Sequence, residues 1–97
     1  MTTYFVSRHT GAVQWARRKN LFVNQLVSHL DTRIIQAGDT VIGSLPVNLA
    51  AQVCAIGARY FHLTLEISPE LRGVELSADQ LEHLGARLQQ FEIKEIK

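Results

Sequence analysis

Three side chains that can handle a phosphate stand side by side near the start of the sequence. Ser7, Arg8 and His9 follow an apolar stretch and precede Gly11, where a helical pattern begins. A guanidinium offers two parallel donors to a phosphate, and an imidazole exchanges protons near neutral pH. A helix N-terminus attracts anions through its free N–H groups. The same residue types also suit an ordinary polar turn, so they leave both interpretations open.

The segments that must position these side chains alternate between strand and helix patterns. The sequence predicts strands over residues 3–7, 25–30, 39–45, 59–67 and 90–97, and helices over residues 11–20, 46–58 and 77–88. Ser77, with Gln80 three residues later, marks the start of the last helix as a capping box. The alternation is typical of an α/β fold with a mostly parallel sheet of about five strands and three helices. Only a short connection joins the second strand to the third, so the direction of the second strand stays open.

Composition narrows the class of protein. At 97 residues the chain is expected to form a single domain over residues 1–97. A net charge of +1 argues against a surface for long nucleic acid or for a membrane, so any anion site must be local. No apolar run is long enough to span a membrane, and no signal-peptide pattern opens the sequence. The lone cysteine, Cys54, excludes an intrachain disulfide, fits the cytoplasm and is expected in the core.

A second candidate loop follows the third strand. In an α/β sheet, ligands bind outside the carboxyl ends of the parallel strands. Gly43, Ser44 and Asn48 lie there, around Pro46. Gly43 permits a close backbone approach and Ser44 can bond a phosphate, whereas Pro46 lacks an N–H group at the helix start. The segment does not match a P-loop, so a tight strand-to-helix turn is the alternative.

The loop after the fourth strand offers another cation. Arg72 stands next to Gly73, a pattern that suits a second phosphate clamp. The alternative is a surface arginine that pairs with Glu70 or Glu75. If the first, third and fourth strands are parallel, all three candidate loops share one edge of the sheet.

The remaining polar side chains point more weakly to chemistry. We expect His29 at a strand end, His62 half-buried in the fourth strand and His83 in solvent. Trp15 is expected in the core, with a nucleobase pocket or a dimer interface as alternatives. Neither a metal-ligand spacing nor a dinucleotide-binding glycine motif occurs, so neither a metal nor a cofactor is expected.

Taken together, the loops resemble those of the Csx-sixteen family of small CRISPR-associated proteins. The resemblance rests on the ordered stretches "FVSRHTGAVQW", "HLD", "GDTVIGSLPVNLAAQVCAIGARYFHL" and "RGVELS". It runs from Tyr4 to about Leu76, and beyond Leu76 only the general helix-then-strand pattern matches. Family members often carry proline where this sequence has Thr10.

The resemblance implies a Rossmann-like domain related to those that sense cyclic oligoadenylates. It also implies metal-independent ring nuclease activity on cyclic tetra-adenylate, which switches off type III CRISPR antiviral signalling. In such a reaction a ribose 2′-hydroxyl attacks the neighbouring phosphate in line. A non-catalytic binder of the messenger and a structural partner of other CRISPR proteins remain the alternatives.

Candidate roles follow from that chemistry. Arg8 or Arg72 would supply positive charge to the phosphoryl oxygens, and His9 would protonate the leaving oxygen or orient the phosphate. Residues placed to hold phosphate or ribose are Ser7, Gly43, Ser44, Asn48 and Gly73. A ring of four nucleotides has near two-fold symmetry, so a homodimer would present the same loops to each half.

Overall fold

The computed structural model describes all of residues 1–97 and contains a five-stranded sheet in the order β2-β1-β3-β4-β5. The strands are β1 (Thr3–Val6), β2 (Gln25–Val27), β3 (Thr40–Gly43), β4 (Arg59–Thr64) and β5 (Arg87–Phe91). The α-helices are α1 (Thr10–Arg18), α2 (Val47–Ile56) and α3 (Ala78–His83), and the 3-10 turns are η1 (Thr32–Ile34) and η2 (Pro69–Leu71). Strands β2, β1, β3 and β4 are parallel, and β5 is antiparallel to β4. The predicted α/β fold with a mostly parallel sheet is confirmed, and the arrangement is Rossmann-like.

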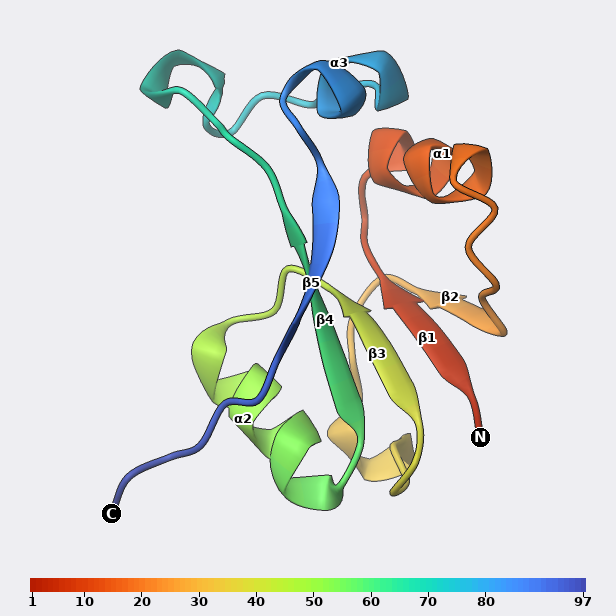
Figure 1. The fold of residues 1–97 in the computed structure, drawn as a ribbon, viewed down its shortest axis with the longest axis vertical. Coiled ribbons are helices and arrows are strands. Elements are labelled where there is room, and N and C mark those ends of the chain that lie inside the picture. Colours follow the sequence, from red (N-terminus) through yellow and green to blue (C-terminus); the bar gives the residue numbers. More distant parts are fainter.

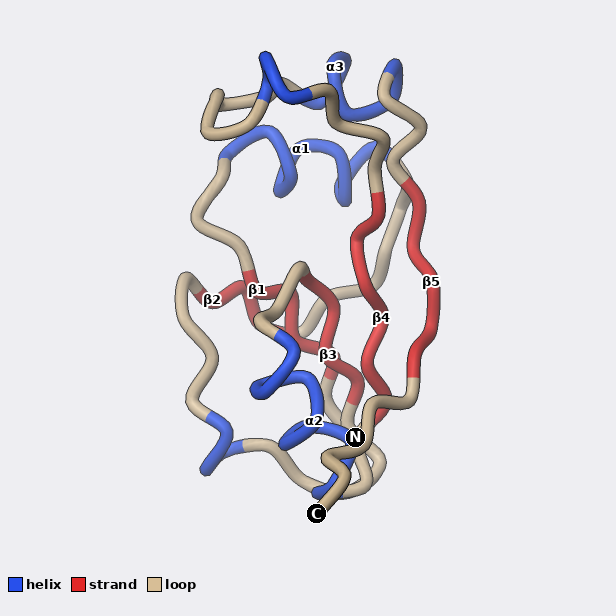
Figure 2. The backbone as a smooth tube through the Cα atoms, turned by 90° about the vertical axis from the view of Figure 1, so that its left-hand side faces the viewer, coloured by secondary structure: helices blue, strands red, loops and turns tan.

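Helices cover both faces of the sheet, because successive strand residues point to opposite sides. On one face, α1 and α3 pack on Phe5, Ile42 and Leu63 of the sheet. On the other, α2 and η1 lie against the face that carries Tyr4, Val41 and Tyr60. Figure 2 shows the resulting layers, with α1 and α3 above the sheet and α2 below.

Trp15 is only 3% exposed and belongs to the cluster under α1, so its expected core position is confirmed. None of the helices combines the length and the apolar character needed to span a membrane.

Several predicted boundaries are wrong, most of them at the carboxyl ends of elements. The predicted helix over residues 77–88 ends at His83, because Gly85 adopts a left-handed φ of +74° that an α-helix cannot continue through. The last strand therefore spans Arg87–Phe91 instead of residues 90–97. The second strand stops at Val27 and not at residue 30, because its only neighbour, β1, ends opposite it. The fourth strand stops at Thr64 and not at residue 67, because Thr64 lies opposite Arg87, the first residue of β5.

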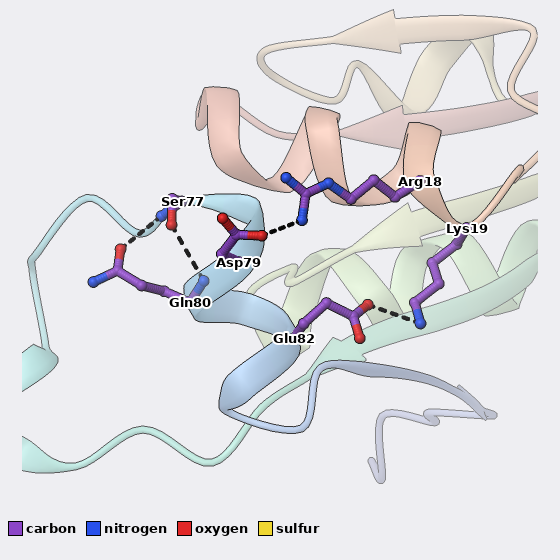
Figure 3. Close-up of polar contacts among 6 residues, drawn as sticks. All are labelled: Arg18, Lys19, Ser77, Asp79, Gln80 and Glu82. Carbon is purple, nitrogen blue, oxygen red and sulfur yellow. Dashed lines mark hydrogen bonds and ion pairs between the residues drawn. The ribbon is translucent and has the colours of Figure 1, made fainter.

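Exposed ion pairs link α3 to the end of α1, and a capping box lies at the start of α3 (Figure 3). Ser77 and Gln80 form the predicted capping box at the start of α3. Arg18 pairs with Asp79, and the Lys19 ammonium lies 2.7 Å from Glu82, where it lowers the pKa of that carboxyl. These pairs are exposed, so each contributes little to the free energy of unfolding. They orient α3 more than they hold it.

A backbone contact brings α1 against the segment that leads into α3. A Cβ atom placed on Gly11 would lie 1.8 Å from the carbonyl oxygen of Leu76. No side chain can occupy that space, and the oxygen belongs to a backbone that cannot swing away. Gly11 therefore permits a helix-to-loop approach that any other residue would prevent. The approach brings residues 9 and 75 together.

We expect Gly11→Ala to destabilise the fold, although helix propensity alone favours alanine. The added methyl group must push α1 away from Leu76, at a cost of about 3 kcal/mol, the upper end for overpacking. The thermal midpoint should fall by roughly 12 to 24 °C in differential scanning calorimetry. Gln14→Ala, on the exposed side of the same helix, is the control and should leave the midpoint nearly unchanged. A Gly11→Ala variant as stable as the wild type would contradict this account of the contact.

Candidate functional site

A pocket of about 580 Å³ opens at the carboxyl ends of the parallel strands. Its volume lies within the range of small-molecule sites, roughly 300 to 1,000 Å³. The base is apolar and includes Phe5, Leu63 and Leu76. Polar groups that line it are Ser7, Arg8, His9, Ser28, His29, Ser44 and Glu75. An apolar base with a few polar groups suits a ligand that combines a flat ring with charged groups.

The pocket gathers most of the residues that the sequence singles out. Lining it are Ser7, Arg8, His9, Gly43, Ser44 and Gly73. The lining does not include Asn48, which is exposed on α2, or Arg72, which is exposed beyond η2. The three loops thus do share one edge of the sheet, as the parallel strand order requires.

Two arginines at this edge carry no carboxylate partner. The guanidinium groups of Arg8 and Arg72 form no ion pair, so the alternative in which Arg72 pairs with Glu70 or Glu75 is wrong. Glu75 contacts His9 instead. Arg8 is exposed at the pocket wall, and its donors are free for an anion.

The backbone N–H groups at the start of α1 also lack a side-chain partner. His9 occupies the N-cap position but its side chain caps no N–H group of the helix, and no acidic residue lies in the first turn. The first-turn N–H groups and the positive end of the helix dipole therefore remain available to an anion. They lie beside an open polar depression that Arg8, Thr10 and Gly11 help to line.

His9 is held from two sides. Its backbone N–H donates to Ser7 Oγ at 3.1 Å, and the Ser7 N–H donates to the Val27 carbonyl at 3.0 Å. Its imidazole Nδ1 lies 2.8 Å from Glu75 Oε2. Ser7 thus shapes the turn through its oxygen, and β2 anchors that turn through Val27.

A buried tyrosine fixes the loop after β3. The Tyr60 hydroxyl accepts from the Leu45 N–H at 3.0 Å, donates to the Gly43 carbonyl at 3.2 Å and lies 2.6 Å from His62 Nδ1. Burial raises the pKa of Tyr60, so the hydroxyl keeps its proton. His62 also packs edge-on against Tyr60 and Phe91, in agreement with the expected structural role.

Ser44 and Gly43 complete the pocket wall at this loop. The Ser44 hydroxyl donates to the Leu63 carbonyl at 3.0 Å, which leaves its oxygen able to accept from a ligand. A Cβ atom on Gly43 would lie 2.9 Å from the Val6 carbonyl, so glycine lets the ends of β1 and β3 come close. The segment is both a tight turn and a pocket wall.

Sequence reasoning missed some of the lining residues. Ser28 and His29 reach the pocket because β2 is parallel to β1 and ends beside it, a direction that stayed open from the sequence. The sequence indicates Glu75 only as a polar residue of the loop after β4 and as an alternative partner of Arg72. No signal in the sequence pairs Glu75 with His9, since the two residues are 66 positions apart.

We expect Tyr60→Phe to loosen the loop after β3. Removal of the hydroxyl leaves the Leu45 N–H and the Gly43 carbonyl without their partner, at a cost of about 1 to 3 kcal/mol in the free energy of unfolding. Urea titration measures that cost, and NMR shift changes should concentrate at residues 43–45. Tyr4→Phe is the control, because the hydroxyl of that buried tyrosine bonds no protein group. Equal effects of the two substitutions would contradict the assignment.

Comparison with known proteins places the chain in a family. Residues 4–94 match the model of the family described as "Putative CRISPR-associated protein (Cas_VVA1548)". No curated protein and no solved structure matches the chain. The matched residues include the pocket and all three α-helices. The chain therefore belongs to this family of CRISPR-associated proteins.

Proposed function

We propose that this CRISPR-associated protein is a ring nuclease. It would cleave cyclic tetra-adenylate to linear adenylates without a metal ion, act in the cytoplasm and switch off type III CRISPR signalling. One observation carries the proposal: the pocket at the carboxyl edge of the sheet brings together Ser7, Arg8 and His9 with Ser44. Membership of a CRISPR-associated family supports the biological setting. The resemblance of the loops to the Csx-sixteen family suggests the ligand.

The pocket residues suit a reaction driven by positioning and charge. The ribose 2′-oxygen, the phosphorus and the leaving 5′-oxygen must lie in line, and negative charge on the phosphoryl oxygens must be stabilised. The free guanidinium of Arg8 and the uncapped start of α1 can bind those oxygens. Ser44 can accept from a ribose hydroxyl, and His9 can take up or give a proton.

The volume of the pocket suggests how many copies of the chain bind one ligand. Its volume of about 580 Å³ suits part of a ring of four nucleotides and not the whole ring. Two copies related by a two-fold axis would present two such pockets to the two halves of the ligand. We therefore propose a homodimer as the active form, with two Arg8 guanidinium groups facing one ring.

The test incubates purified protein with cyclic tetra-adenylate in excess EDTA and separates the products by liquid chromatography. We expect linear adenylates with cyclic phosphate ends. Arg8→Ala should lower kcat/KM by roughly 100-fold or more, because one preorganised charge contact to the transition state is lost. Arg17→Ala is the control, since Arg17 is exposed on α1, forms no ion pair and lies outside the pocket.

The possible outcomes separate three functions. Linear products in EDTA support the nuclease. Tight binding with intact ligand recovered would overturn catalysis in favour of a non-catalytic binder. Absence of both binding and cleavage would overturn both and favour a structural partner of other CRISPR proteins.

A further inference from the structure

Glu75 is the one carboxylate that touches a candidate catalytic side chain. Its Oε2 lies 2.8 Å from Nδ1 of His9. Both residues line the pocket, and Glu75 forms no other ion pair. This contact is a feature of the tertiary fold, because it joins the loop after β1 to the segment before α3.

Backbone contacts on both sides hold the two residues in place. Gly11 lies against the Leu76 carbonyl, one residue after Glu75, and the capping box at Ser77 fixes the start of α3. On the other side, His9 is held by the hydrogen bond from its N–H to Ser7 Oγ. The pair is therefore set by its supports and not by its own attraction, which is weak because the two side chains are 61% and 63% exposed.

The chemistry of the contact assigns the imidazole proton. A carboxylate has no hydrogen to donate, so the contact is a hydrogen bond only if Nδ1 carries the proton. In the neutral imidazole, Nε2 then has the free lone pair. A carboxylate on Nδ1–H also orients the ring and stabilises the imidazolium that forms when Nε2 takes a proton.

We propose that Glu75 is a positioning residue that holds His9 as the Nδ1–H tautomer and makes Nε2 the proton acceptor of the pocket. The first part concerns the free protein. The second part rests on the proposed function and assigns His9 the role of base in the attack step. An imidazole can act as an acid or as a base, and this proposal assigns His9 the role of base.

The step balances as follows. The 2′-hydroxyl gives its proton to His9 Nε2 while its oxygen forms a bond to phosphorus. The bond from phosphorus to the 5′-oxygen breaks, its electron pair stays on that oxygen, and the oxygen takes a proton from solvent. The imidazolium then releases its proton to solvent, so the products are a 2′,3′-cyclic phosphate and a 5′-hydroxyl.

NMR tests the first part on the free protein. Nitrogen-15 shifts and couplings of the histidine rings, at about pH 8.5 where an ordinary imidazole is neutral, distinguish the two tautomers. His9→Gln identifies the His9 signals among those of His29, His62 and His83. We expect the Nδ1–H form in the wild type and a shift toward the Nε2–H form in Glu75→Ala. The control is Glu70→Gln, which removes an exposed carboxylate of the nearby turn η2 and should leave the His9 signals unchanged.

Kinetics test the second part. Glu75→Ala should lower kcat for cyclic tetra-adenylate by roughly 10- to 100-fold, the range seen when a metal-ligating histidine loses the partner that orients it. KM should change less than kcat, because the role proposed for Glu75 is exercised through His9. Glu75→Gln keeps an acceptor oxygen and should retain an intermediate kcat. The thermal midpoint should stay within a few degrees in both variants, since the exposed pair adds little stability.

Each outcome decides a part of the proposal. If His9 of the wild type is the Nε2–H tautomer, the whole proposal for Glu75 is overturned, whatever the measured nuclease activity. The expected tautomer with unchanged kcat in Glu75→Ala would overturn the base role. A wild-type protein that leaves the ligand intact would remove the base role together with the proposed function, and the NMR result would still decide whether Glu75 holds His9.

Discussion

The backbone of α1 lies directly against the carbonyl of Leu76, and the rest of the site depends on that contact. Because residue 11 has no side chain, the helix and the incoming segment touch without a layer of side chains between them. The contact sets the distance between the loop after β1 and the segment before α3. The pocket lies beside this contact, at the carboxyl ends of the parallel strands.

Burial determines which side chains stabilise the packing of the helices and which only orient them. Phe5, Trp15 and Leu81 are almost fully buried and hold α1 and α3 on the sheet. Ion pairs such as Lys19 with Glu82 lie at the surface and mainly set orientation. At the pocket the polar groups that the fold needs are already satisfied, as in the bonds from Ser44 and Tyr60. The groups left without partners, above all the guanidinium of Arg8, are those that a ligand can use.

Much of the scaffold could be predicted from the sequence. Alternating strand and helix patterns indicate the α/β fold, and the rule that parallel strands share a carboxyl edge brings Ser7, Gly43 and Gly73 to one place. Local patterns cannot predict tertiary pairs, so the contact between His9 and Glu75 went unseen. The direction of β2 depends on pairing energy, and so His29 was not placed at the pocket. Residue chemistry favours a phosphate, whereas the proposal of cyclic tetra-adenylate as the ligand rests on the resemblance.

The antiparallel β5 has a consequence for how the molecule connects to anything else. It begins opposite Thr64, near the pocket, and ends opposite Tyr60, at the amino edge of the sheet where β1 also starts. Both ends of the chain therefore lie in the half of the molecule that holds α2, as Figures 1 and 2 show. Any further polypeptide, affinity tag or surface linkage at either end would leave from the side away from the pocket and keep its mouth open.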